Sequence, residues 1–201
     1  IMIGFAAAYL DVLGSTGLVI LEALVSAIVM TIFALWLSSR LFPVSKQLDA
    51  AFDVDVEMRP AFRRAMVLVG VFLGLGTVAE AISTLEAVPL TARGVFVLPV
   101  YLGLSFGFLR LSQLLRRHRK EEIAAEEGAV ETSFSQRTLT IGAQALRIVA
   151  IVGPAIAAMG YLNLGAAIMT PTAQSLGVLA LLVALQPLIR DAYALDSGKT
   201  N

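Results

Sequence analysis

Acidic and histidine side chains, which have the greatest capacity for chemistry, are few and scattered in this chain. The run Asp53-Val-Asp55-Val-Glu57 places three carboxylates at alternating positions, a pattern that could converge on a hard cation such as Ca²⁺. The glycine and the distal glutamate of a calcium loop are missing, so an acidic loop at a membrane surface is the preferred interpretation. His118 is the only histidine, and a metal site would need further ligands. We expect no bound metal.

Nucleophilic and redox chemistry is also poorly provided for. The chain has no cysteine, which excludes a disulfide framework, a thiolate nucleophile and a cysteine-ligated metal. No recognisable catalytic motif is present. The fifteen basic and fifteen acidic residues cancel, so the net charge predicts no polyanionic partner. The sequence therefore predicts a protein that is not an enzyme, uses no cofactor and binds no nucleic acid.

Glu22 and Glu80 are of interest because they lie within long apolar segments. An ionisable residue inside a membrane span is a candidate functional residue by default. Both glutamates, however, lie within about two turns of the expected outer ends of their spans, where water or lipid headgroups reach a carboxylate. An interfacial carboxylate is the preferred interpretation, and proton or ion coupling is the alternative.

The elements that carry these residues are long apolar segments. Hydrophobic residues make up 58% of the 201-residue chain, and the mean hydropathy is +0.83. A bilayer core of roughly 30 Å needs about 20 mostly apolar residues per helix. We expect five full membrane helices and one that is cut short by the start of the chain. The six segments cover residues 1–12, 17–41, 61–82, 94–115, 139–164 and 166–189.

Short and long connections alternate between these segments. Tight turns are expected around residues 11–16, 83–93 and 163–172. The pattern predicts an all-α polytopic membrane protein made of three consecutive transmembrane helical hairpins. The expected organisation is a first hairpin at 1–42, a linker at 43–60, a second hairpin at 61–115, a charged linker at 116–137, a third hairpin at 138–193 and a polar tail at 194–201.

The basic residues predict an orientation. Of the fifteen Lys and Arg residues, only Arg93 lies in a tight turn. Lys and Arg near membrane ends are retained on the cytoplasmic side. We therefore expect a multi-pass protein of the bacterial inner membrane whose tight turns are periplasmic and whose charged linkers are cytoplasmic.

Two pairs of glycines predict how the second hairpin closes. Gly70 and Gly74 are four residues apart on one span, and Gly103 and Gly107 have the same spacing on the next. Small residues at this spacing let the backbones of membrane helices approach closely. We expect these four glycines to lie between the two helices of the hairpin at 61–115.

Prolines lie inside three of the spans. Pro99, Pro154 and Pro187 should kink their helices, and in a transporter such breaks often line a substrate site. No constellation of polar residues accompanies these prolines in the sequence, which argues against that function. Thr170 and Pro171 are expected to cap and begin the last helix.

A basic cluster follows the span at 94–115. Arg116, Arg117, Arg119 and Lys120 could contact anionic lipid headgroups, because a basic residue near the membrane surface contributes about 1 kcal/mol. The alternative is a solvated helix that extends from the membrane and is stabilised by pairs such as Arg117 with Glu121. The two interpretations are compatible.

The carboxy-terminal part of the chain resembles a known family. The resemblance begins with Arg147-Ile-Val-Ala-Ile-Val-Gly-Pro-Ala-Ile-Ala-Ala-Met-Gly-Tyr-Leu-Asn-Leu-Gly165 and continues through Met169-Thr-Pro-Thr172 to Leu188-Ile-Arg-Asp191. These roughly 45 residues are similar to the region just before the pore domain in large MscS-like mechanosensitive channels. The earlier hairpins match that family only in hydropathy, and no Gly/Ala-striped pore helix is present.

The resemblance implies a membrane-embedded, tension-sensing region of a channel that releases ions and solutes under hypo-osmotic stress. Its partners would be the lipid bilayer and further copies of itself, with a heptamer implied by the family. A pore domain would follow the tail at 194–201. A fragment of a multi-helix secondary transporter and a membrane scaffold without a role in gating are the alternatives.

Overall fold

The computed structural model describes residues 14–43, 57–85, 92–125 and 134–197, which form five α-helices and no strand. The helices are α2 (Ser15–Leu41), α3 (Arg59–Thr84), α4 (Arg93–Ala125), α5 (Phe134–Ala158) and α6 (Leu162–Ser197). Each is long and apolar enough to cross a membrane, so the prediction of an all-helical, multi-pass membrane protein is confirmed. The shortened helix expected at 1–12 lies outside the described residues, within which the count is five rather than six.

Most helix starts follow the sequence signals. Pro60 occupies the first turn of α3, where its missing N–H costs nothing because that position has no intrahelical acceptor. α4 begins at Arg93, one residue before the expected start, and runs to Ala125, ten residues past the expected end of its apolar span. The basic cluster is therefore helical, as the solvated-helix interpretation required.

The turn between α5 and α6 differs from the prediction. α5 ends at Ala158 and α6 begins at Leu162, so residues 163–172 are helical and Pro171 lies inside α6. Gly160 ends α5 with a φ of 98°, a left-handed conformation that glycine adopts without strain. The amide of Gly160 donates to the Ala157 carbonyl at 3.0 Å, and that of Tyr161 donates to the Ile156 carbonyl at 3.2 Å. This paired pattern is the Schellman helix stop.

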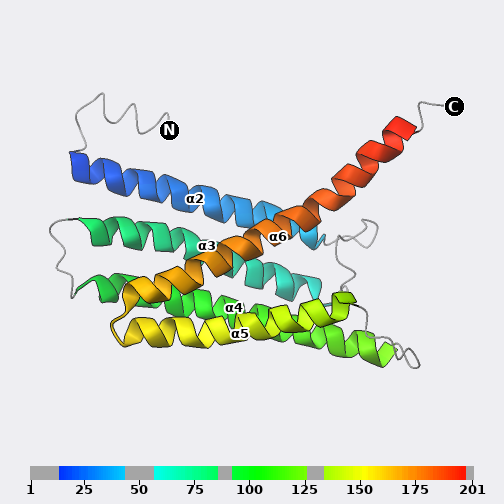
Figure 1. Cartoon of the computed structure of the whole chain (residues 1–201). Helices are drawn as coiled ribbons and strands as arrows, with labels where there is room; N and C mark the ends of the chain where they lie inside the picture. Colours follow the sequence, from blue (N-terminus) through cyan, green and yellow to red (C-terminus); the bar gives the residue numbers. More distant parts are fainter. Residues whose placement is uncertain (1–13, 44–56, 86–91, 126–133, 198–201) are drawn as a thin grey trace.

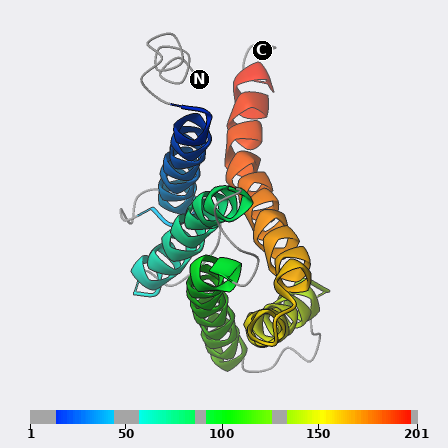
Figure 2. The same cartoon turned by 90° about the vertical axis from the view of Figure 1, so that its left-hand side faces the viewer.

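The helices form a curved row that α6 crosses diagonally. α2, α3, α4 and α5 follow one another side by side, whereas α6 runs from beside α5 back towards α2 (Figures 1 and 2). We call the end where α3 and α5 stop and α4 and α6 start the turn end, and the opposite end the linker end. α2 packs against α3 more extensively than any other two helices pack together.

Two hydrophobic cores hold the row together, with Met66 and Leu114 packed against both, and α6 contributes to each. Near the turn end, Met169 and Ala173 of α6 pack with residues of α4 and α5 that include Tyr101, Phe108 and Ala157. Nearer the linker end, Ala180 and Ala184 of α6 pack with Leu37 and Leu41 of α2, with Phe42 directly after α2 and with Phe62 of α3. We call these the turn-end core and the linker-end core.

Large apolar side chains also cover the outside of the bundle. They are exposed on several helices: Ile28, Ile32, Val95, Leu102, Phe106, Ile141, Ile148, Ile151, Val178, Leu179 and Leu182. Such a surface is unfavourable in water but suits a lipid environment, where helices satisfy all of their own backbone hydrogen bonds.

Candidate functional site

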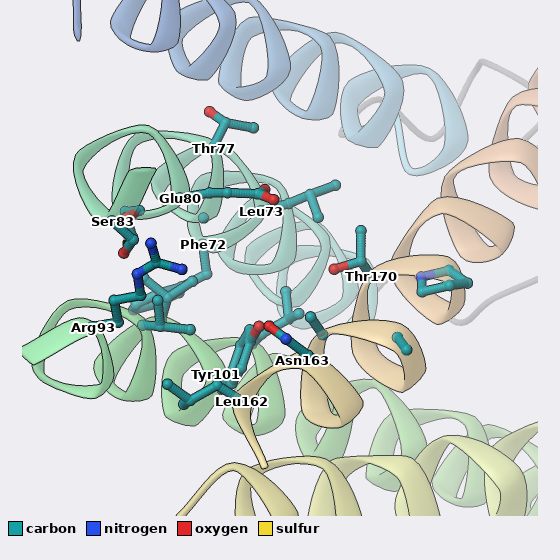
Figure 3. Close-up of a pocket in the computed structure, with 18 of the residues that line it drawn as sticks. Phe72, Leu73, Thr77, Glu80, Ser83, Arg93, Tyr101, Leu162, Asn163 and Thr170 are labelled. Carbon is teal, nitrogen blue, oxygen red and sulfur yellow. Dashed lines mark hydrogen bonds between the residues drawn. The ribbon is translucent and has the colours of Figure 1, made fainter. Parts of the chain in front are cut away.

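A cavity of about 610 Å³ lies under the first half of α6, between that helix, α3 and α4, with Met30 contributed by α2. Its wall is unusually polar for the interior of a membrane bundle. The polar side chains that line it are Thr77, Glu80, Ser83, Thr84, Arg93, Tyr101, Asn163, Thr170 and Gln174. They come from three helices, so the fold and not any one segment creates the site (Figure 3).

The cavity begins at the turn end and reaches well into the bundle. Ser83 is next to the last residue of α3, Arg93 is the first residue of α4, and Asn163 is in the first turn of α6. The lining on α4 extends from Arg93 to Leu104. At 1.5 Å per residue this spans about 16 Å, roughly half the thickness of a bilayer core.

Two opposite charges share this cavity without neutralising each other. Glu80 is exposed and Arg93 is half-buried, and within the described residues no ion pair joins them. The Nε atom of Arg93 is buried and has no hydrogen-bond partner. Figure 3 shows Arg93 at the same end of the cavity as Ser83. A buried donor without a partner is unfavourable, so this guanidinium is suited to receive an acceptor from a ligand.

Other groups on the wall offer hydroxyl, amide and main-chain contacts. The hydroxyl of Ser83 donates to the Ala79 carbonyl at 2.6 Å and that of Thr77 donates to the Gly74 carbonyl at 2.7 Å, so both hydroxyl oxygens can still accept. Pro171 has no N–H to donate to the Ala167 carbonyl four residues earlier. Because Ala167 and Pro171 both line the cavity, this wall carries a main-chain acceptor outside the regular helical ladder.

A second cavity continues the first along α6 towards the linker end. It measures about 440 Å³, and Gln174 is the one polar residue in its wall. The two cavities share Met30, Leu73 and Gln174. Together they form a crevice beneath α6 with a polar section at the turn end and an apolar section behind it.

The glycines expected to close the second hairpin face two different helices. Gly103 and Gly107 of α4 lie against Phe72 and Val69 of α3, but Gly70 of α3 lies against Ala34 of α2. A Cβ atom on Gly74 would lie 2.8 Å from the carbonyl oxygen of Ala27, also in α2. The expectation that all four glycines lie between α3 and α4 is wrong for Gly70 and Gly74, because the small face of α3 turns towards α2.

The remaining predicted residues lie outside the polar cavity. Pro99 and Pro154 are inside α4 and α5, which continue as helices beyond them, and Pro187 lies within α6. Arg116 and Arg117 are exposed on α4 near the linker end. Arg119 and Lys120 also belong to α4, but their side chains are outside the described part of the structure.

Sequence reasoning missed this site. Pro171, which the sequence predicts to begin a helix, lines the cavity, whereas Pro99 and Pro154 do not. The side chain of Pro187 is outside the described part of the structure. The expectation of no polar constellation concerned only these other three prolines and did not cover this site. Glu80 was singled out, yet its partners are 13 and 83 or more residues further along the chain, on α4 and α6. The one signal in the sequence for this site was that two ionisable residues, Glu80 and Arg93, each lie near a helix end.

Comparison with known proteins found no relative of the chain. No family model, curated protein or solved structure matches the chain.

Proposed function

We propose that this chain is the membrane-embedded, tension-sensing region of a mechanosensitive ion channel that releases ions and solutes under hypo-osmotic stress. The observation that carries the proposal is the position of α6, which packs in both hydrophobic cores. α2 meets α6 at the linker-end core and α5 meets it at the turn-end core, while α3 and α4 contribute to both. A change in the tilt of α2 relative to α5 would therefore displace α6.

The physical basis is the response of lipid-facing helices to bilayer thickness. Hydrophobic mismatch costs fractions of a kcal/mol per Å for a helix, and these costs add over the five described spans. Tension thins the bilayer and so favours the arrangement whose helices are more tilted. A difference of a few kcal/mol between two arrangements is enough to change which one is populated.

α6 is suited to pass this displacement on. It has 36 residues and is therefore about 54 Å long, well beyond the roughly 30 Å of a bilayer core. Its carboxy-terminal part extends away from the other helices (Figure 1). The resemblance of residues 147–191 to the segment preceding a pore covers about half of α5 and most of α6. It supports this role, as well as assembly of several copies, a heptamer by the resemblance, around that pore.

The charge distribution supports an orientation for the proposed channel region. Arg40, Arg59, Arg63, Arg116 and Arg117 lie on helix segments near the linker end. Following the positive-inside rule, we place the linker end in the cytoplasm and the turn end in the periplasm of a bacterial inner membrane.

Patch-clamp recording tests the function. Deleting residues 1–137 from the full-length protein should shift the tension threshold and leave the unitary conductance nearly unchanged, because conductance is set by pore-lining groups. A full-length protein that stays silent up to lytic tension would contradict the channel proposal. An unchanged threshold in the deletion protein would reduce these helices to a scaffold.

A secondary transporter is the second candidate, and the polar cavity favours it. Transporters bind substrate near the bilayer midplane where helix backbones are interrupted, and the Ala167 carbonyl beside Pro171 provides such an interruption. Uptake assays in proteoliposomes separate the two candidates. A solute flux that saturates with concentration and is abolished by Glu80→Gln would favour the transporter over the channel.

A further inference from the structure

We infer that the crevice beneath α6 is a binding site for a single phospholipid with a zwitterionic headgroup, whose phosphate is bound at Arg93, whose cationic group is bound at Glu80, and whose acyl chain occupies the apolar section. The inference goes beyond the proposed function, because such a site can exist whether or not the chain senses tension. Charge, the arrangement of helix ends and the shape of the crevice each support it.

The mouth of the cavity carries charge of both signs. The amino termini of α4 and α6 lie there, and helix amino termini carry a partial positive charge that favours phosphate. Arg93 adds a full positive charge. The carboxy terminus of α3, with a partial negative charge, lies at the same end of the cavity, and Glu80 adds a full negative charge about one turn before α3 ends.

Both charged side chains are at unfavourable ends of their own helices. An acidic residue is destabilised near a helix carboxy terminus and a basic residue near an amino terminus. The last turn of α3 has no basic residue, and the first turn of α4 has no acidic residue, that would offset this. Local rules of helix stability are broken most often at functional sites. A ligand that carries a negative and a positive group would relieve both conflicts at once.

The continuation of the crevice identifies the ligand as an amphiphile. Beyond Gln174 the wall is formed by apolar residues such as Phe33, Leu37, Met66 and Leu181. A small water-soluble zwitterion would leave this section empty, whereas an acyl chain would fill it. The order of the two sections also matches a lipid, since the charged section is at the helix ends and the apolar section is deeper in the membrane.

Lipid retention measured by native mass spectrometry tests the inference. The full-length protein is placed in nanodiscs of equimolar phosphatidylethanolamine and phosphatidylglycerol with identical acyl chains and then transferred to detergent. We expect one phosphatidylethanolamine to be retained about tenfold better than phosphatidylglycerol, because one charge-assisted hydrogen bond separates the two. Equal retention of the two lipids by the unmodified protein would overturn the proposal.

Variants assign the two charges. Glu80→Gln should remove the preference for phosphatidylethanolamine, since it removes the partner of the ammonium group. Arg93→Gln should lower the retention of both lipids about tenfold, since both carry the phosphate. Arg110→Gln is the control, because Arg110 is exposed on α4, lies over the Phe106 ring at 5.5 Å and is not in the crevice wall. A preference that survives Glu80→Gln would contradict the assignment.

Filling the apolar section separates a lipid from a free solute. A Cβ atom on Gly177 meets nothing within 4 Å, so Gly177→Leu places its side chain in open space in the apolar section. This change should abolish lipid retention, and Gly142→Leu on the exposed face of α5 should not. The contrary outcome has two parts: the unmodified protein retains no lipid, and soluble phosphoethanolamine binds equally well to it and to Gly177→Leu. In that case the site takes a free solute, and the lipid proposal is overturned.

Discussion

The α2–α3 and α4–α5 helix pairs are held together by different kinds of contact. Between α2 and α3 the contact is steric: Gly70 lies against Ala34, and Gly74 approaches the backbone of Ala27. Between α4 and α5 it is polar, because the buried hydroxyls of Ser105 and Ser112 donate to main-chain carbonyls of α5. Lipid provides no hydrophobic force between helices, so close backbone packing and interhelical hydrogen bonds are the available stabilising contributions.

The serine contacts repeat along the two helices. Ser105 donates to the carbonyl of Ala150 and Ser112, seven residues later, donates to that of Ala143 at 2.7 Å. Seven residues are two helical turns, so both hydroxyls lie on one face of α4. Within the described residues α2 has no comparable buried hydroxyl bond, and only 6% of its apolar span is buried, against 39% for that of α4. The α2–α3 contact is the most extensive in the bundle, but it depends on close packing rather than on hydrogen bonds.

The largest effect should come from adding one methyl group to the steric contact. Gly74→Ala places a Cβ atom 2.8 Å from the Ala27 carbonyl oxygen, so a backbone has to move, and we expect a destabilisation of about 2 kcal/mol. Unfolding of the purified protein by SDS in mixed micelles, followed by circular dichroism, measures it. Gly76→Ala on the same helix is the matched control, since its Cβ would meet Val100 at an ordinary 3.5 Å. Equal stability of the two variants would show that α2 and α3 do not approach as described.

A smaller effect is expected at the polar contact. Ser105→Ala and Ser112→Ala should each destabilise the protein by about 0.6 kcal/mol, the average for interhelical hydrogen bonds in membranes, and the double variant by about twice that. Ser39→Ala serves as control, because its hydroxyl donates to the Trp36 carbonyl of its own helix and is exposed. The same unfolding assay applies, and a double variant as stable as the control would remove the polar contact from this comparison.

The smallest effect is expected for the one hydroxyl that reaches across the α2–α3 contact in the described residues. Thr77 donates to its own helix at 2.7 Å, and the Ala23 carbonyl of α2 is 3.5 Å away. Thr77→Val should cost less than about 0.5 kcal/mol, because a long contact contributes little. A larger loss of stability than that of Ser112→Ala would show that α2–α3 also depends on hydrogen bonding.

The sequence predicted helices better than it predicted their partners. Apolar length alone located α2 and α3 to within two residues, because crossing a bilayer sets a minimum length. The four glycines showed that helices approach closely, but a stripe of small residues does not say which neighbour it meets, and Gly70 and Gly74 meet α2. Thr170 and Pro171 predict a helix start, and the sequence does not show that Pro171 instead lies inside a helix beside a cavity.

The polar cavity was beyond sequence reasoning for a related reason. Glu80 and Arg93 lie on the consecutive helices α3 and α4, and Asn163 joins them only through the diagonal course of α6. Each residue alone is typical of an interfacial position near a helix end. Their convergence depends on helix packing, which hydropathy does not specify.

The coupling of the two hydrophobic cores through α6 is tested most directly by a single substitution in the linker-end core. Ala184 is 8% exposed and packs in that core with Leu37, Leu41 and Phe62. Ala184→Leu overpacks it by about 1–3 kcal/mol, which should change the open fraction at a fixed tension at least fivefold. The measurement is the tension for half-maximal opening in patches of the full-length protein, with unitary conductance as the internal control.

Leu182→Ala, on the lipid-facing side of the same helix at 56% exposure, is the matched variant and should leave the threshold near that of the unmodified protein. We predict a shifted threshold with unchanged conductance for Ala184→Leu alone. A threshold that does not move, in a variant that still opens and still conducts normally, would contradict the role of α6 as the link between the two cores.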